Sequence, residues 1–293
     1  MQPKFNHFLS SSFTLFLENQ LLTEGQAYSN ISGQMFPSNK KKINGLNFYA
    51  SPHAQWVYDS SISGANIPTG ATINNVFTNR GTNSLSLDFF HGGVYTSVNN
   101  ANIQVNYSKK DFNFYFKPER ETELLLETMF NGEISYTDLT ANNPTKIIAP
   151  CIIINSKNSQ NEPFSFGGQD QTESVYQAVI LTNNYYHLDG AMSIFRDLNE
   201  VYFPIIDFED IPWDEKGDIK NGEFNYKNLA IKYPNPSQRA IIDRVLVKNV
   251  KSTNRGNNNF DIGYAEFRVL SYRYPRGPAQ QYVSHTGDYN IYP

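Results

Sequence analysis

The first 22 residues carry apolar side chains at intervals of three and four, the spacing of one face of an α-helix. The apolar positions are Phe5, Phe8, Leu9, Phe13, Phe16, Leu17 and Leu21. The polar positions that fall largely on the opposite side are Asn6, Ser10, Ser12, Glu18 and Asn19. The pattern predicts an N-terminal amphipathic helix, packed either on its own domain or against a neighbouring subunit. A helix lying on a membrane surface is disfavoured, because the polar side carries almost no Lys or Arg.

From about residue 46 to residue 116 the hydrophobic period changes to two, which is the period of a strand with one buried face. Short runs of this kind are separated by Gly, Pro, Asn and Ser, and segments 78–83 and 89–95 have the composition of hairpin turns. This spacing predicts an antiparallel β-sandwich or barrel-like domain. Together with the helix it is expected to occupy residues 1–117.

A smaller α+β unit, a sheet with helices, is predicted over residues 118–274. Pro118 opens a helical pattern at residues 118–130 in the position where proline is tolerated, and acidic residues follow in the first turn. The further elements are strands at residues 146–157, 174–186, 239–252 and 260–274 and a helix at residues 187–203. Apolar and polar residues alternate in the last strand, so one face is expected to be buried and one solvated. Residues 275–293 lack a helical period and are predicted to form an extended arm.

A glycine pair, Gly167 and Gly168, lies between two of the predicted strands. Such a pair after a strand can cradle a phosphate, but that arrangement needs the N-terminus of a following helix. A strand follows here, and neither the GxxxxGK[ST] nor the GxGxxG pattern is present. The loop is therefore predicted to join two paired strands as a long hairpin and to serve as a contact element.

Composition narrows the classes of function. The formal net charge is −4, which disfavours specific nucleic-acid binding. No apolar run approaches the ~20 residues of a membrane-spanning helix, so no membrane partner is expected. The lone cysteine, Cys151, lies in an apolar run and is predicted to be a small buried side chain, and synthesis in a reducing cytoplasm is expected.

Candidate chemistry is sparse. The five histidines are scattered without metal-ligand spacing, and no GxSxG serine accompanies them. Six acidic residues gather within residues 207–218: Asp207, Glu209, Asp210, Asp214, Glu215 and Asp218. This segment fits a solvated acidic loop or a docking surface for a basic partner. Its acidic residues could bind a divalent cation, but they do not follow the order of an EF-hand loop. A glycosidase-type pair of carboxylates also stays open, although the sequence gives no reason to choose one pair. We therefore predict no catalytic, cofactor or metal site, and no enzyme activity.

The second half of the chain has an order of elements that resembles a known family. The residues that carry it are "ETELLLETMF", the stretch 150–198 and "DRVLVKNVKS", which give helix, strand, long hairpin, strand, helix and strand. This order resembles that of tail terminator (tail completion) proteins of long-tailed bacteriophages. The first 117 residues have no counterpart in the smallest members of that family and would be an added β-domain.

The resemblance implies a structural subunit of the virion that is made in the bacterial cytoplasm and forms a ring, expected to be sixfold, at the head–tail connection. Its partners would be further copies of itself and the neighbouring neck, tail-tube or sheath proteins. The residues expected at such contacts are Phe5, Phe8, Phe13, Phe16, Phe164, Phe166, Gly167, Gly168, Asp207, Glu209, Asp210, Tyr289 and Tyr292.

A second hypothesis comes from the aromatic content, with 19 Tyr and 21 Phe. Surface Tyr and Trp side chains can stack on sugar rings. The alternative is therefore a β-protein that binds or cleaves carbohydrate, such as a tail-fibre or baseplate module.

Overall fold

The structure, a computed structural model, describes residues 5–43, 45–81, 85–99, 101–116, 149–165, 169–214, 217–220, 222–235, 238–255 and 258–273. Several predicted features lie outside the described residues. They are the helix at residues 118–130, the arm at residues 275–293, and the contact residues Phe166, Gly167, Gly168, Tyr289 and Tyr292.

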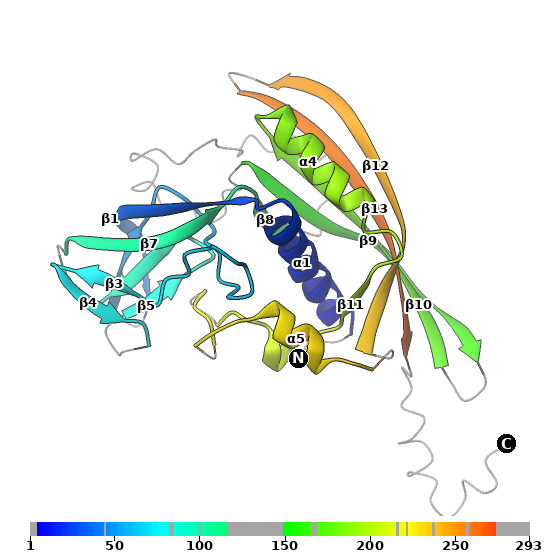
Figure 1. Cartoon of the computed structure of the whole chain (residues 1–293), viewed down its shortest axis with the longest axis horizontal. Coiled ribbons are helices and arrows are strands. Elements are labelled where there is room, and N and C mark those ends of the chain that lie inside the picture. The colour runs from blue at the N-terminus through cyan, green and yellow to red at the C-terminus, as the bar shows by residue number, and fades with distance from the viewer. Residues whose placement is uncertain are drawn as a thin grey trace, which may run out of the picture.

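The first half of the described chain forms a barrel-like antiparallel sheet of seven strands in the order β4-β3-β7-β1-β2-β6-β5 (Figure 1). The strands are β1 (Tyr28–Ile43), β2 (Leu46–Ala50), β3 (Gly70–Ile73), β4 (Val76–Asn79), β5 (Leu85–Asp88), β6 (Gly93–Thr96) and β7 (Ile103–Lys110). The predicted turn at residues 89–95 is confirmed, because it joins β5 to β6. Gly92 is required there: its φ is 63°, and a Cβ atom would collide with the carbonyl oxygen of His53.

The second half forms a six-stranded sheet in the order β11-β12-β13-β10-β9-β8. Its strands are β8 (Asn113–Phe116), β9 (Cys151–Ser165), β10 (Gln169–Thr182), β11 (Tyr202–Pro204), β12 (Arg239–Arg255) and β13 (Asn258–Arg273). The pairing is antiparallel except between β8 and β9. The predicted class, mixed α and β with mostly antiparallel sheets and an N-terminal helix, is confirmed.

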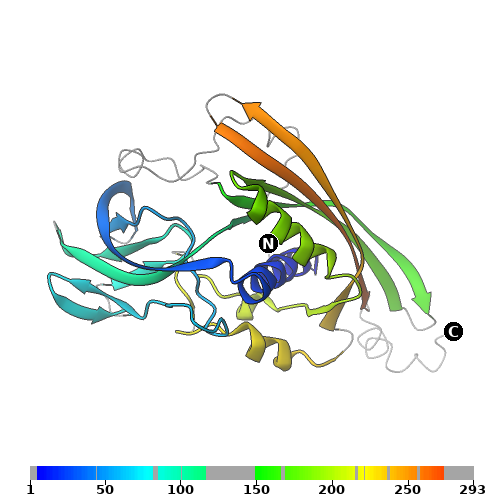
Figure 2. The same ribbon diagram turned by 45° about the horizontal axis from the view of Figure 1, so that its top comes forward.

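Helix α1 (Phe5–Glu24) lies between the two sheets rather than on the surface (Figures 1 and 2). The ring of Phe13 contacts those of Tyr176, Phe203 and Phe267 at centroid distances of 4.6, 5.7 and 5.1 Å. The residues of α1 that are buried are Leu9, Ser10, Ser12, Phe13, Leu15, Phe16, Leu17, Glu18, Asn19, Leu21 and Leu22. The helix is therefore enclosed on several sides, and four of the polar positions expected to face away from the core are buried with the apolar ones.

A single hydrophobic cluster runs through both halves of the described chain. It includes Trp56 and Tyr107 from the first half, Phe13 from α1, and Phe195 and Phe267 from the second half. The units predicted at residues 1–117 and 118–274 thus share a core. Strand β8, which was expected to continue the first sheet, pairs with β9 in the second sheet instead.

Helix α4 (Tyr185–Arg196) covers the inner face of the second sheet and is shorter than the predicted helix. Asn184 is its N-cap and accepts a hydrogen bond from the amide of Tyr186, which ends β10 before the two tyrosines. Beyond the helix, Glu200 has a φ of 62°, and its amide donates to the carbonyl of Ile242. The chain therefore turns into β11 instead of continuing the helix to residue 203.

The alternation predicted in the last strand is confirmed. Ala265, Phe267 and Val269 of β13 are fully buried against the core, whereas Arg268 is exposed on the opposite face. Cys151 is buried as predicted, and burial raises the pKa of its thiol well above the ordinary value.

Candidate functional site

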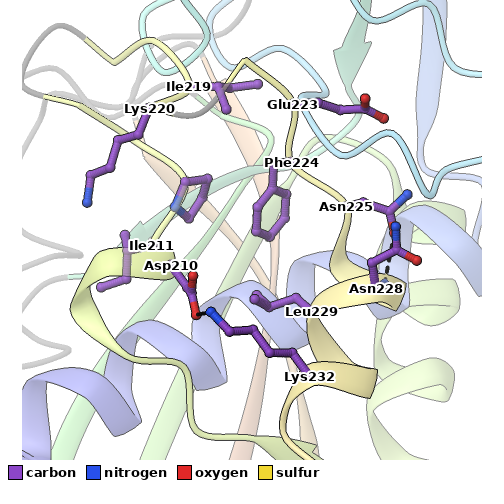
Figure 3. Close-up of a pocket in the computed structure, with 11 residues that line it drawn as sticks. Asp210, Ile211, Ile219, Lys220, Glu223, Phe224, Asn225, Asn228, Leu229 and Lys232 are labelled. Carbon is purple, nitrogen blue, oxygen red and sulfur yellow. Dashed lines mark hydrogen bonds and ion pairs between the residues drawn. The ribbon is translucent and has the colours of Figure 1, made fainter.

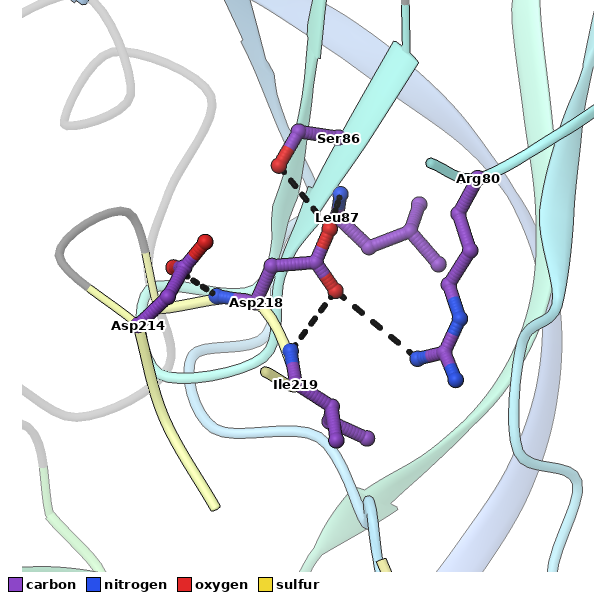
Figure 4. Close-up of polar contacts among 6 residues, drawn as sticks. All are labelled: Arg80, Ser86, Leu87, Asp214, Asp218 and Ile219. Carbon is purple, nitrogen blue, oxygen red and sulfur yellow. Dashed lines mark hydrogen bonds and ion pairs between the residues drawn. The ribbon is translucent and has the colours of Figure 1, made fainter. Parts of the chain in front are cut away.

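The acidic segment at residues 207–218 does not form one solvated loop. The Asp218 side chain is 10% exposed, and its carboxylate accepts hydrogen bonds from the Ser86 hydroxyl and the Leu87 and Ile219 amides (Figure 4). Arg80 lies 3.7 Å from the same carboxylate. Asp218 therefore fastens its loop to β5, and the interpretation of this residue as part of a solvated loop is wrong.

Asp210 belongs to a second arrangement, beside the short helix α5 (Tyr226–Lys232). Its carboxylate accepts hydrogen bonds from the Lys232 ammonium (Figure 3) and from the Tyr233 hydroxyl. Burial alone would raise the pKa of Asp210, but these two hydrogen bonds and the charges of Lys232 and Lys220 lower it overall. Asp210 is thus held as an anion by partners within its own chain.

A groove of about 350 Å³ lies between this ion pair and the start of α5 (Figure 3). Its apolar lining includes Ile211, Ile219, Phe224 and Leu229. Lys220, which also lines it, donates to the carbonyl of Phe208 at 3.2 Å. Asp210, Lys220 and Lys232 are thus paired within the chain, whereas Glu223, which also lines the groove, is exposed.

Of the three acidic residues proposed for contacts, Asp207 and Glu209 are exposed, unlike Asp210, which is partly buried. Within the described ranges, no three His, Cys, Asp or Glu side chains gather closely enough to hold a metal ion. Asp207 and Glu209 remain candidates for contact with a partner.

A buried polar network ties α1 to the first half of the chain. The Lys110 ammonium at the end of β7 donates to Glu18 across 2.7 Å, and the two side chains are 3% and 5% exposed. Asn19 donates to Asp59, which also accepts from the amide of Tyr226 in α5. This network is unusual for a helix predicted to have a solvated side. It joins α1 to β7 through Glu18 and Lys110, and to α5 through Asn19 and Asp59.

Electrostatics within the network follow from burial. Burial lowers the pKa of Lys110, while the negative charge of Glu18 opposes that change. Burial and the neighbouring carboxylates of Glu18 and Asp59 raise the pKa of Tyr58. The Lys110 ammonium also lies 4.6 Å from the centre of the Tyr58 ring, a cation–π distance.

The second sheet has two long edges that no described strand covers. Strand β8 pairs with β9 only as far as Ile154, and β11 pairs with β12 only from Arg239 to Ile241. Within the described chain, residues 156–165 and 244–255 therefore leave one side of their backbone unpaired. At ~3.3 Å per residue these edges are about 33 and 40 Å long.

The outer face of this sheet, opposite α1 and α4, has two parts. At one end it carries a buried apolar cluster of Cys151, Ile153, Val179, Leu181 and Ile262, and further along the strands it is charged and exposed. Arg268 of β13 contacts Glu173 at 2.7 Å and Asp243 at 3.5 Å, and Lys157 lies 3.5 Å from Glu266. Leu246, on the edge strand β12, is 51% exposed. This charged part of the face is therefore solvated and balanced in charge, while the two edges carry backbone groups that no described strand pairs with.

The predicted aromatic contact residues are divided by the structure. Phe13 and Phe16 are fully buried in the core of their own chain, so the hypothesis that these two side chains bind a neighbouring subunit is wrong. Phe5 and Phe8 are half-buried, and the Phe5 ring lies 4.1 Å from the Arg273 guanidinium. Phe164, at 55% exposure near the tip of β9, remains open to a partner and packs on Tyr272 at 4.7 Å.

Sequence reasoning did not single out Lys110, Glu18 or the edges of β9 and β12. The apolar runs in the sequence are shorter than the strands themselves. The hairpins β9–β10 and β12–β13 extend beyond the core into polar sequence, so the predicted strand lengths were too small. One feature of the sequence could have indicated an open edge: the uncharged run "NSQN", residues 158–161, which lies in β9.

Compared with known families, the chain matches no family model, and no curated protein sequence matches it. None of the described helices is both long enough and apolar enough to cross a membrane.

Proposed function

We propose that the chain is a structural subunit that associates with copies of itself, head to tail, into a closed ring of the kind that tail terminator proteins form at the head–tail connection of a phage. The observation that carries the proposal is the pair of open edges on opposite sides of one sheet. A surface that binds a different surface on the next copy makes a heterologous contact, and such contacts form rings when the rotation closes.

The strand directions favour this contact. Strands β12, β13, β10 and β9 are successively antiparallel, so β12 and β9 run in opposite directions. When β9 of one copy lies beside β12 of the next copy, the pairing is again antiparallel. Backbone groups on about ten residues of each edge would then gain hydrogen bonds, each contributing about 0.5–1.5 kcal/mol net.

Charge on the outer face gives a way to test the same pairing, because the open edge of β12 is basic whereas that of β9 carries one cation, Lys157, and one anion, Glu162. Arg244 and Lys248 are exposed along the open edge of β12. On β9, Glu162 is exposed, and Asn158 pairs with Val175 on the face opposite the buried Ser174 and Tyr176. Opposite charges on neighbouring strands contribute about 0.2–1 kcal/mol, and like charges oppose pairing.

The order of elements in the second half, its resemblance to the terminator family, and the sixfold expectation that comes with it support the position in a phage particle. In that setting the neighbouring neck, tail-tube or sheath proteins are the further partners. The exposed residues Asp207, Glu209 and Phe164 are the described candidates for those contacts.

The test uses a matched pair, Asn158→Lys and Asn158→Glu, in the full chain. Lysine would face the basic edge of β12 in every contact of a ring and shift assembly to higher concentration, whereas glutamate would leave assembly unchanged or strengthen it. Light scattering after size-exclusion chromatography and native mass spectrometry measure the mass over a dilution series. Circular dichroism checks that both variants fold.

Three outcomes contradict the proposal. Wild-type protein that stays monomeric at micromolar concentration excludes the ring. Equal behaviour of the two variants shows that β12 of a neighbour does not meet this edge. Weakening by both variants indicates a symmetric β9–β9 dimer, in which either substitution brings like charges together.

A further inference from the structure

A small cavity lies where α1 meets the buried network, and it is separate from the sheet edges. It has a volume of about 110 Å³. Glu18, Tyr58 and Lys110 line its polar part, and its aromatic lining includes Phe89, Phe114 and Trp213. Phe90 and Phe116, which also line it, are 39% and 45% exposed, so the cavity reaches the surface beside them.

Size and shape restrict the occupant. A dry cavity of about 150 Å³ lined by apolar side chains is known to bind benzene, so about 110 Å³ is the scale of one six-membered ring. Ring edges already surround the space: Trp213 packs edge-on against Tyr58 at 5.2 Å. Aromatic walls favour an aromatic occupant through offset and edge-to-face contacts.

The polar part restricts the occupant further. A lysine ammonium has three N–H donors. The Lys110 ammonium donates to Glu18 at 2.7 Å, and a second direction faces the Tyr58 ring at 4.6 Å. A purely apolar ring would leave the remaining donor unsatisfied, whereas a hydroxyl can accept from Lys110 and donate to a carboxylate oxygen of Glu18.

We propose that this cavity binds a phenol ring, with the hydroxyl inserted toward Lys110 and Glu18 and the opposite end of the ring at the mouth between Phe90 and Phe116. Such a ring has two sources, a free phenolic compound or a tyrosine side chain presented by a protein. The inference does not depend on the ring assembly, because none of the cavity residues lies on the open edges of β9 or β12.

The test titrates wild-type protein with p-cresol and, as the matched ligand without a hydroxyl, toluene. Trp213 lines the cavity and reports binding by its fluorescence, while Trp56 is fully buried in the core. We expect saturable binding of p-cresol at least tenfold tighter than that of toluene. Equal affinities, or no saturable binding up to the solubility limit, would overturn the proposal; in the second case the cavity holds only water.

A second arm distinguishes the two sources. N-acetyltyrosinamide and N-acetylphenylalaninamide carry the same backbone and differ in the hydroxyl. Binding of p-cresol together with tyrosinamide, and not of phenylalaninamide, indicates that the mouth admits a protein side chain. Binding of p-cresol alone assigns the cavity to a free phenol.

The location is tested with Thr14→Leu, because Thr14 lines the cavity from α1 and its larger replacement fills the space without removing the ion pair. The variant should lose p-cresol binding at least tenfold while keeping the wild-type circular dichroism spectrum. Unchanged binding places the ligand elsewhere and refutes the assignment. If the variant does not fold, the comparison of p-cresol with toluene on wild-type protein still decides the proposal.

Discussion

The buried ion pair between Glu18 and Lys110 gives the most demanding test of the way α1 is held. Replacing Lys110 with methionine keeps most of the volume of the side chain and leaves the Glu18 carboxylate buried without its cation. Breaking a buried pair in this way costs about 3–5 kcal/mol, because the remaining charge has lost its compensation. The two side chains are 3% and 5% exposed, so solvent screening offers little relief.

The reverse experiment removes both charges. In the double variant Glu18→Leu with Lys110→Met no ion is left in the core, and replacements of this kind are often neutral or stabilising. The Tyr58 hydroxyl, which is hydrogen bonded to Glu18, then loses its partner, at a cost of about 1–3 kcal/mol. We therefore expect the double variant to lie within about 3 kcal/mol of wild type and above the single variant in stability.

The assay is equilibrium unfolding in urea, followed by tryptophan fluorescence and by circular dichroism, with the free energy extrapolated to water. A third variant, Lys157→Met, is the matched control, because Lys157 makes an exposed pair with Glu266 that should contribute at most about 1 kcal/mol. A cost below about 1 kcal/mol for Lys110→Met, equal to the control, would refute the enclosed position of α1 and the network built on it.

Three further predictions follow from other parts of the core. Phe13→Ala should destabilise the chain by about 3–5 kcal/mol in the same assay, because the Phe13 ring contacts Tyr176 and Phe267 at the centre of the core. A variant that stays folded and loses only self-association would instead indicate that α1 lies on the surface. Asp218→Ala should cost about 2–4 kcal/mol, since it strands the Leu87 and Ile219 amides, whereas Glu209→Ala, at an exposed site, should cost less than about 0.5 kcal/mol. Burial raises the pKa of Tyr176 to about 12, against weaker opposing hydrogen bonds, so its contribution is complete below pH 10 and about 2–3 kcal/mol is lost as pH rises from 10 through 12. Urea unfolding at a series of pH values should therefore show a larger loss of stability over this range for wild type than for Tyr176→Phe, and an equal loss in both would contradict this.

The sequence predicted the elements of this fold better than their packing. The period of the first 22 residues correctly predicts α1, because helical spacing is a local property. The same pattern could not show that Ser12 and Glu18 are buried, since their partners, the Ile206 amide and Lys110, are distant in the chain. The apolar stripe packs within its own chain, but the ring of Phe13 contacts Tyr176, Phe203 and Phe267 of the second half rather than the domain predicted at residues 1–117, and the polar side is enclosed as well.

The candidate sites, like the fold, could be predicted where they depend on neighbouring residues and not where they depend on distant ones. Six acidic residues within residues 207–218 read as one feature in the sequence, yet Asp210 and Asp218 take different partners from α5 and β5. The cavity beside Lys110 combines residues of α1, β7, β8 and three loops, so no local sequence motif could have predicted it. The hairpin between β9 and β10 was foreseen from two strands and a glycine pair, because pairing of adjacent strands depends on neighbouring sequence.

The enclosure of α1 changes where self-association has to be sought. The inner face of the second sheet is occupied by α1 and α4, so a contact that this sheet makes with another copy is left with the exposed part of its outer face and with the open edges of β9 and β12. Long open edges invite unspecific pairing, and natural proteins restrain them with charged residues, proline and bulges. Both edges here carry such devices: Lys157 and Pro163 lie on β9, and the register of β12 shifts between Ile242 and Arg244. These irregularities would disrupt pairing with a flat partner strand in most registers. A partner strand with matching irregularities could pair in a single register. The features that prevent aggregation of a single subunit are therefore the ones that would select one head-to-tail register in a ring.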